Sequence, residues 1–400
     1  LRGMVAVPLV YDPYDYEIDA NPHPIWKRMR DEAPLYYNEQ YDFYALTRFD
    51  DVLRAHLDAA TFSSARTTVL ELMGEAPAGF EDFMIFMDPP AHTRYRKLVS
   101  RAFTPRHIAE LEIRIRELCA DFLDPLVGAG GFDYVADFGA RLPVLVISAL
   151  LGAPREDTKQ LQEWSDATLH IDPGGMMGDA VAQINRQIHD YWQAHIDYRR
   201  KHPQDDIMGE LMTAELETAD GGARHLTDSE LHGFYGLLSG AGNETVARFL
   251  GWAATGLDQF PAERAKLAAD PELIPNAVEE ILRWEAPSAI QGRWVTEDVP
   301  LHGSVLPKNT KVALLTGAAN RDERVFEKPD EIQVERDISR HVAFGYGIHF
   351  CLGAALARLE GRIALEETFK RFPTWTVDRD NCEMVHTSTV RGYAKVPIST

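Results

Sequence analysis

The stretch that decides the fold is Phe344-Gly345-Tyr346-Gly347-Ile348-His349-Phe350-Cys351-Leu352-Gly353. It places one cysteine in a glycine-rich loop, and apolar residues then recur every three or four positions from Leu352 to Ile363, the spacing of one helix face. Pro373 ends the pattern. Free N–H groups at the start of such a helix favour thiolate over thiol, and glycines let the backbone fold closely around one atom. The stretch therefore predicts a cradle in which Cys351 is a soft metal ligand.

The stretch resembles the haem-binding signature of the cytochrome P-450 superfamily, the haem-thiolate monooxygenases. The family pattern is Phe-Gly-x-Gly-x-(His or Arg)-x-Cys-x-Gly, and its fixed positions are all filled, by Phe344, Gly345, Gly347, His349, Cys351 and Gly353. The resemblance implies that Cys351 is the axial ligand of haem iron and that Phe344 packs beside the sulfur and helps set its redox potential. A thiolate suits this role because it pushes electron density toward O–O cleavage.

Other interpretations of the loop explain less of it. A buried, inert cysteine on a glycine-rich turn is the common case for a lone cysteine, but it leaves the six fitted positions unexplained. A zinc site is disfavoured because Cys119 and Cys382 are isolated and no Cys-x-x-Cys pair exists. A phosphate loop is disfavoured because no Gly-x-Gly-x-x-Gly opens the helix.

Composition indicates a single globular domain over residues 1–400. The chain is 45% apolar and 26% charged, and no linker, repeat or low-complexity tract divides it. We expect residues 1–12 to be a flexible N-terminus, and residues 1–11 hold no apolar run long enough for a signal peptide or membrane anchor. Three isolated cysteines argue against a disulfide framework and for the cytoplasm. A net charge of −21 disfavours nucleic acid and anionic membranes as partners.

A long helix is predicted upstream of the cysteine loop. Thr227 and Glu230 fit a capping box, and the helical pattern runs from there to Phe260. At about 1.5 Å per residue such a helix crosses a whole domain. Its middle holds Gly240 and Gly242, each of which costs about 1 kcal/mol relative to alanine, so we expect another group to approach closely there.

The middle of this helix resembles the oxygen-activation motif of the superfamily. The pattern Ala-Gly-x-(Asp or Glu)-Thr is filled by Ala241, Gly242, Glu244 and Thr245. The resemblance implies that Ala241 and Gly242 leave room for O₂, and that Glu244 and Thr245 form an acid–alcohol pair that delivers protons. Oxygen cleavage needs protons in a site that otherwise excludes water, so such a pair has a physical purpose. The alternative is a helix kinked for packing, with Glu244 solvated.

Two further sets of polar residues match the family. Glu280 and Arg283 share a helix face, and the resemblance implies that Arg336 joins them in a structural triad. The alternative is a surface ion pair.

His92 and Arg96 lie one turn apart on a helix that we expect Asp88 to cap. The resemblance implies that His92 and Arg96 bind the haem propionates together with Arg293 and His349. The alternative for His92 and Arg96 is an exposed basic face.

The resemblance also implies a substrate pocket walled by residues 65–86, 170–178, 237–245, 288–291 and 388–390. The candidate lining residues are Phe83, Phe86, Leu237, Leu238, Ala241, Ile290 and Val390. An apolar pocket with few polar anchors favours a hydrophobic substrate such as a fatty acid, terpenoid or steroid. The alternative is that these residues form ordinary core.

The motifs together imply a monooxygenase that inserts one atom of O₂ into a hydrophobic small molecule, with haem b as cofactor. No flavin or iron–sulfur domain follows Cys351, so we expect a separate ferredoxin and its reductase to supply electrons derived from NAD(P)H. They would dock beneath Cys351 through basic contacts, for which the candidates are Arg101, Arg340, Arg358 and Arg362. The alternatives are a peroxygenase driven by H₂O₂ and a non-catalytic haem protein that stores a ligand or senses a gas.

The implied fold is mainly α with small β-sheets near the N-terminal third and the C-terminus. It is a single cytochrome P-450 domain shaped like a triangular prism, with about a dozen helices. The haem would lie between the long central helix and the helix that follows the cysteine loop. Periodicity alone supports only a mainly α fold. We expect a cytoplasmic monomer.

Overall fold

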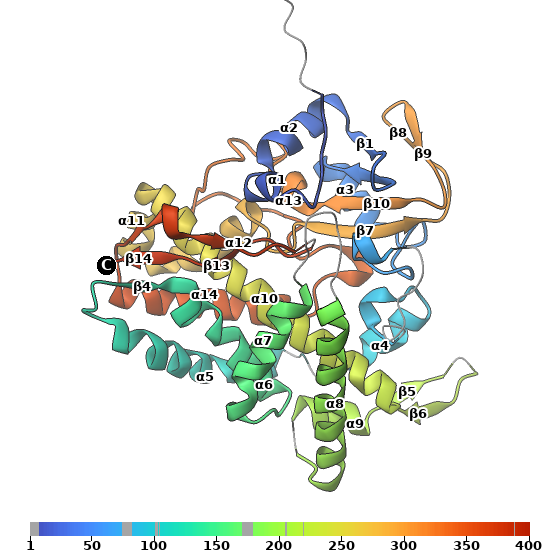
Figure 1. Ribbon diagram of the computed structural model, residues 1–400, viewed down its shortest axis with the longest axis horizontal. Helices are drawn as coiled ribbons and strands as arrows, with labels where there is room; N and C mark the ends of the chain where they lie inside the picture. The colour runs from blue at the N-terminus through green and yellow to red at the C-terminus, as the bar shows by residue number, and fades with distance from the viewer. Residues whose placement is uncertain are drawn as a thin grey trace, which may run out of the picture.

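The computed structural model describes residues 8–73, 82–100, 103, 105–169, 179–204, 206–218, 220–387 and 389–400. Within these residues helices predominate over short strands, which confirms the prediction of a mainly α fold with small sheets. Figure 1 shows the N-terminal helices beside a sheet at one side of the molecule and the longer helices at the other. In the part of the chain that the structure describes, no helix combines the length and the apolar character needed to cross a membrane.

The α-helices follow one another along the chain as α1 (Tyr16–Ala20), α2 (His23–Glu32), α3 (Phe49–Leu57), α4 (Ala91–Val99), α5 (Pro105–Leu123), α6 (Arg141–Leu150), α7 (Thr158–Leu169), α8 (Asp179–Lys201), α9 (Ile207–Thr213), α10 (Asp228–Gln259), α11 (Pro261–Ala269), α12 (Ile274–Trp284), α13 (Thr316–Ala319) and α14 (Ala354–Arg371).

The strands are β1 (Leu35–Asn38), β2 (Phe43–Leu46), β3 (Phe62–Ser63), β4 (Gly131–Asp133), β5 (Glu215–Glu217), β6 (Ala223–His225), β7 (Ile290–Val295), β8 (Val299–Leu301), β9 (Ser304–Leu306), β10 (Lys311–Leu315), β11 (Thr376–Val377), β12 (Glu383–Met384), β13 (Tyr393–Lys395) and β14 (Pro397–Ser399).

The largest sheet joins the N-terminal region to residues 290–315. Its strand order is β1-β2-β10-β7-β3, with β10 parallel to β2 and antiparallel to β7. Val312 of β10 pairs with Tyr44 on one side and with Arg293 on the other. This register places Arg293 on an interior strand, where its side chain is buried.

Helix α10 crosses the molecule as predicted (Figure 1). The capping box of Thr227 and Glu230 is present, and the helix continues unbroken for 32 residues. A Cβ on Gly242 would lie 2.5 Å from Cδ1 of Ile147, so this glycine lets α6 pack closely on α10. At Gly240 no described atom lies within 4 Å of the same position. The expected close approach is therefore confirmed at Gly242 only.

The expected structural triad is formed on α12. Glu280 and Arg283 are both 0% exposed and pair at 2.7 Å, and Arg336 reaches Glu280 at 3.0 Å. Arg283 also donates to the carbonyl of Asn320 at 3.0 Å, and the side-chain oxygen of Asn320 accepts from the N–H of Val342 at 2.8 Å. The triad is thus connected through Asn320 to the segment that leads into the cysteine loop. The alternative of a surface ion pair is wrong because both partners are buried.

The prediction of a flexible N-terminus over residues 1–12 is wrong at Tyr11. Its side chain is 2% exposed, and its N–H donates to the hydroxyl of Tyr36 at 2.9 Å. The ring packs edge-on against Trp26 of α2, so burial of apolar surface orders the chain at this point. Residues 1–7 lie outside the described residues.

Helix α14 carries a buried carboxyl group. Glu360 is 1% exposed, and its Oε2 has no hydrogen-bond partner among the described residues. Burial disfavours the charged form and raises the pKa of Glu360 to about 8. A raised pKa means that this group contributes stability below its ordinary pKa of 4.5, and that the contribution is lost as the pH rises toward about 8.

We therefore expect Glu360→Gln to be more stable than the parent protein at about pH 8.5, by about 3–5 kcal/mol at roughly 1.4 kcal/mol per pKa unit. Near pH 5 the two proteins should have similar free energies of unfolding. Urea unfolding followed by circular dichroism at both pH values measures the difference. Glu117→Gln is the control, because the Glu117 side chain is 58% exposed. An equal gain for Glu360→Gln at both pH values would contradict the assignment.

Candidate active site

Backbone geometry folds the cysteine loop around Cys351. The N–H of Cys351 donates to the carbonyl of Phe344 at 2.9 Å. Gly345 and Gly347 have φ angles of 63° and 68°, in the left-handed region that favours glycine. The guanidinium of Arg358 lies 4.6 Å from the centre of the Phe344 ring, which fixes that ring beside the loop. Local conformation thus presents one cysteine immediately before α14.

The electrostatics of Cys351 differ from the prediction. Its thiol accepts from the N–H of Gly353 and lies near Arg96 and Arg358, and all three lower the pKa. Cys351 is accessible to solvent, yet enough protein surrounds its sulfur that desolvation raises the pKa by more, so the net direction is upward. Gly353 has an ordinary φ of −83°, so its place in the loop does not depend on the left-handed conformation of Gly345 and Gly347.

Four predicted cofactor residues gather at one edge of this loop. His92 and Arg96 lie on α4, and the rings of His92 and His349 are 4.2 Å apart. Burial, followed by the positive charges of Arg293 and Arg96, lowers the pKa of His349 to about 3. Burial lowers the pKa of Arg293 to about 10 and that of His92 to about 4. The alternative of an exposed basic face is wrong for His92, which is 2% exposed.

The prediction that Asp88 caps α4 is wrong. The N-cap position is Pro90, and no side chain caps this helix. The carboxylate of Asp88 instead accepts from the N–H of Ser64 at 2.9 Å and from the hydroxyl of Ser63. It therefore ties the start of α4 to the end of β3.

His56 belongs to the same edge, although the sequence analysis does not identify it. It lies on α3, is 4% exposed, and neither ring nitrogen has a partner among the described residues. A Cβ on Gly345 would lie 3.6 Å from its ring. Burial, followed by the charges of Arg293 and His349, lowers the pKa of His56 to about 3. A lone histidine in a helix carries no motif, so only tertiary packing reveals it.

Several histidine nitrogens at this edge lack a hydrogen-bond partner among the described residues. Each buried donor or acceptor left unpaired costs about 1–3 kcal/mol. Both ring nitrogens of His56 and of His92, and Nε2 of His349, are buried and unpaired among the described residues. Together with Arg96 and Arg293 they suit carboxylates, and Cys351 supplies a soft ligand nearby. This donor set fits a haem with two propionates. Within the described residues, no group of three or more His, Cys, Asp or Glu could hold a bare metal ion.

The acid and the alcohol of α10 are turned toward opposite ends of the helix. The hydroxyl of Thr245 donates to the carbonyl of Ala241 at 3.0 Å. Glu244 is 3% exposed and accepts from Nη2 of Arg248 at 2.8 Å, and Arg248 also donates to the carbonyl of Tyr393 at 2.7 Å. The alternative of a solvated Glu244 is therefore wrong. Arg248 could have been found from the sequence, because it follows Glu244 at the i,i+4 spacing.

Of the seven candidate pocket residues, Leu237, Leu238 and Ala241 lie on α10, and Phe83 packs against that helix. The ring of Phe83 would be 2.9 Å from a Cβ on Gly236, and it stacks with Phe86 at 6.0 Å. Leu237 and Leu238 belong to the same hydrophobic cluster as Phe83. Ala241, also on α10, is exposed.

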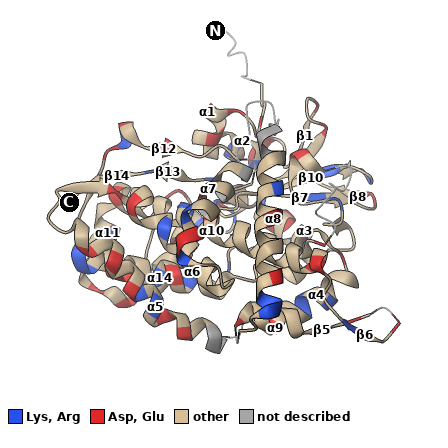
Figure 2. Ribbon diagram, turned by 60° about the horizontal axis from the view of Figure 1, so that its bottom comes forward, with Lys and Arg blue, Asp and Glu red and all other residues tan. Residues whose placement is uncertain are grey.

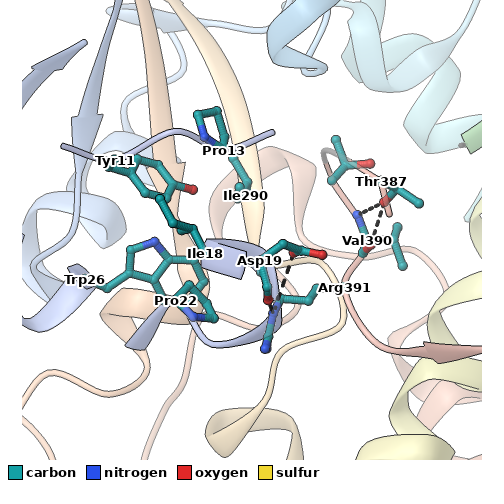
Figure 3. Close-up of a pocket in the computed structure, with 12 residues that line it drawn as sticks. Tyr11, Pro13, Ile18, Asp19, Pro22, Trp26, Ile290, Thr387, Val390 and Arg391 are labelled. Carbon is teal, nitrogen blue, oxygen red and sulfur yellow. Dashed lines mark hydrogen bonds and ion pairs between the residues drawn. The ribbon is translucent and has the colours of Figure 1, made fainter. Parts of the chain in front are cut away.

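Ile290 and Val390 lie elsewhere. Figure 3 shows them lining a small pocket beside the N-terminal helices, whose wall includes Tyr11, Trp26 and Arg391. The seven candidates are therefore divided between two regions. Residues 74–81, 170–178 and 388, which also belong to the predicted walls, lie outside the described residues.

Basic residues near the cysteine loop are largely neutralised within the molecule. Arg358 pairs with Glu279 at 2.7 Å, and Arg362 is paired with carboxylates of α5 and α14. Figure 2 shows acidic and basic positions interleaved along these two helices. Arg340 is exposed, and Arg101 lies outside the described residues.

Known proteins share this arrangement. The family profile described as cytochrome P-450 matches residues 265–395. Cytochrome P-450 123 of Mycobacterium tuberculosis is 40% identical over 395 residues, which cover 98% of this chain and 97% of the relative. This chain belongs to the cytochrome P-450 family.

Two further relatives extend the match. Vitamin D(3) 25-hydroxylase of Pseudonocardia autotrophica is 37% identical and covers 95% of this chain and 94% of its own length. A Bacillus megaterium cytochrome P-450 solved in complex with testosterone is 31% identical, with a TM-score of 0.86 over 96% of this chain and 98% of that one. The fold is that of the cytochrome P-450 family, as predicted, and the protein is a haem-iron monooxygenase.

We expect Gly347→Ala to lose most of its haem. A Cβ there would lie 2.6 Å from the carbonyl oxygen of His56, and the left-handed conformation alone costs roughly 1–2 kcal/mol. Haem content per purified protein measures the effect. Gly303→Ala is the matched control, because its φ is 76° but no described atom lies within 4 Å of the added Cβ. Equal haem content in the two variants would show that haem binding does not depend on the contact between α3 and the loop.

Proposed function

We propose that this enzyme hydroxylates a hydrophobic small molecule of the fatty acid, terpenoid or steroid type, with electrons from a separate ferredoxin and its reductase. One atom of O₂ enters the substrate and the other leaves as water. The observation that carries the proposal is the convergence of three groups of residues. These are the Cys351 loop, the buried histidines of α3 and α4, which lack hydrogen-bond partners among the described residues, and the buried Arg293 of β7.

Haem b is the cofactor in this proposal. Cys351 would ligate its iron, and His92, Arg96, Arg293 and His349 would hold its propionates. When bound, the haem supplies the oxidising chemistry that inserts oxygen into a C–H bond. The protein residues bind it, orient it and exclude water around it.

In this proposal, Thr245 and Glu244 deliver protons to the site of oxygen cleavage. Thr245 is held by its bond to Ala241, which leaves its hydroxyl oxygen able to accept a hydrogen bond from a second donor. Glu244 becomes the donor once its carboxylate has taken up a proton and turned away from Arg248, from which it now accepts hydrogen bonds. Because that ion pair is buried, the turn is a costly step that requires a compensating contact or water.

The substrate class follows from the apolar surface on α10 and residues 82–86. This surface offers hydrophobic contacts and few polar anchors, which favours a hydrophobic ligand. One relative is named for vitamin D(3) and one solved relative binds testosterone. Both molecules derive from the steroid skeleton, so we place steroid-like substrates first among the three classes.

Electron transfer partners are proposed to dock beneath Cys351. The ion pairs of Arg358 and Arg362 leave Arg340 as the exposed cation among the described docking candidates. We therefore expect fewer charge contacts than the sequence suggests and a weaker dependence of reduction on salt. A rate of reduction by ferredoxin that is unaffected by Arg340→Glu would contradict this placement.

Two other functions remain as alternatives. A peroxygenase takes H₂O₂ directly, and then the acid–alcohol residues Glu244 and Thr245 would have no purpose. A haem protein that only binds a gas or ligand would show no turnover with any electron source. The presence of both proton-handling residues favours the O₂-dependent monooxygenase.

Substrate binding and turnover test the proposal. We expect one of the three classes, tested as steroids, fatty acids and terpenes, to shift the Soret band of the purified holoenzyme from low to high spin. Ferredoxin, reductase and NAD(P)H should then convert that compound into a product one oxygen atom heavier. Turnover with H₂O₂ alone would favour the peroxygenase, and the absence of turnover with both oxidants would contradict catalysis.

We expect Thr245→Ala to form product roughly 10²-fold more slowly, because general acid–base groups contribute effects of this size. Consumption of NAD(P)H should continue and release H₂O₂ instead of product. Thr245→Ser is the control, because it keeps the hydroxyl and should retain most of the coupling. Equal coupling in the alanine and serine variants would show that the hydroxyl takes no part in proton delivery.

A further inference from the structure

His56 combines deep burial with two unsatisfied ring nitrogens. It is 4% exposed, and neither Nδ1 nor Nε2 has a hydrogen-bond partner among the described residues. A neutral imidazole carries one N–H donor and one acceptor, so both functions are left without a partner. Leaving such groups unpaired costs about 1–3 kcal/mol each, so a partner for His56 is expected at this place.

The position of His56 is set by the cysteine loop. A Cβ on Gly345 would lie 3.7 Å from its Nδ1, and a Cβ on Gly347 would lie 2.6 Å from its carbonyl oxygen. Helix α3 therefore packs directly on the loop, and the two glycines with positive φ make room for it. The imidazole cannot swing to solvent without displacing this contact.

The surroundings of His56 are cationic or neutral. Arg293 and His349 are the groups whose charges act on it, and Arg293 is itself buried, donating to the carbonyl of Gly292 at 2.7 Å. The carboxylate of Asp88, whose charge also acts on Arg293, is already engaged by the end of β3. A missing partner that satisfies such a set is an anionic oxygen acceptor held next to Arg293.

We propose that His56 donates a hydrogen bond to a propionate carboxylate of the bound haem, as a third imidazole at that edge beside His92 and His349. The inference rests on the proposed function, in which Cys351 ligates haem and Arg293 binds a propionate. Helix α3 then contributes to cofactor binding directly, and not only by supporting the loop. Its contribution adds a neutral donor where a further cation would be repelled by Arg293.

A packing role is the competing explanation. Under it, the ring fills space against Gly345 and the two nitrogens are incidental. Phenylalanine would serve that role nearly as well, because it keeps the flat ring and removes only the polar atoms. Glutamine would serve it less well, but glutamine keeps a donor for a carboxylate. The two substitutions therefore separate the explanations.

The rate of haem transfer from the holoenzyme to excess apomyoglobin measures how far the proposed hydrogen bond of His56 retains the haem. We expect His56→Phe to lose haem at least about tenfold faster than the parent protein, since a hydrogen bond to a charged group is worth roughly 1.5–3 kcal/mol. His56→Gln should lie close to the parent. His195→Phe is the matched control, because His195 is a buried histidine on α8 that bonds the carbonyl of Leu151.

Repeating the transfer experiment with haem dimethyl ester tests whether the propionate carboxylate is the partner of His56. We expect the difference between the parent protein and His56→Phe to vanish, because the ester carries no charged acceptor. The resonance Raman band of propionate bending in the ordinary holoenzyme should also shift in His56→Phe and stay unchanged in His195→Phe. A Raman band unmoved in His56→Phe, or equal acceleration with both haems, would overturn the proposal.

Failure of this inference differs from failure of the proposed function. If Cys351 does not ligate haem, the reduced carbon monoxide complex of the parent protein lacks the absorption of a sulfur-ligated haem. If only the role of His56 is wrong, that absorption is present and haem loss from His56→Phe matches that from His195→Phe.

Discussion

The sulfur of Cys351 has to be held at one point by a loop, and much of the surrounding structure serves that constraint. Within the loop, the bond between the N–H of Cys351 and the carbonyl of Phe344 closes the turn. From outside, the buried pair of Glu280 and Arg283 is connected to the loop through Asn320. The position of the Cys351 loop therefore depends on buried polar contacts far along the chain, which would be costly to break.

Glu244, the proposed proton donor, is tied to the C-terminal segment in a similar way. Arg248 pairs with Glu244 and donates to the carbonyl of Tyr393. Gly392 allows this approach, because a Cβ there would lie 2.5 Å from Cβ of Arg248. Val390, a candidate pocket residue, lies in the same segment. The segment at residues 392–393 and the orientation of Glu244 are thus connected through Arg248.

Local patterns in the sequence predicted the features that are determined by residues close together in the chain, such as helix caps and helix ends. The capping box of Thr227 and Glu230, the end of α14 before Pro373 and the shared face of His92 and Arg96 all follow from helical spacing, and the structure contains them. The positive φ of Gly345 follows from the need for a tight loop.

Contacts with residues far along the chain could not be predicted from helical spacing. Asp88 was expected to cap α4, but Ser63 and Ser64 compete for its carboxylate from another element. Arg358 was expected to be free for a partner protein, but Glu279 neutralises it. His56 shows no pattern at all, because its importance lies in what α3 contacts. Spacing reports residues on one face of a helix and cannot report which remote group is packed against them.

The absorption spectrum of the reduced protein under carbon monoxide shows whether Cys351 ligates the haem iron. We expect a Soret band displaced far to the red, as in a sulfur-ligated haem, and the loss of this band in Cys351→Ala. Cys119→Ala should keep the band, because that thiol is buried on α5. A parent protein without the displaced band, or a Cys351→Ala variant that retains it, would contradict the account.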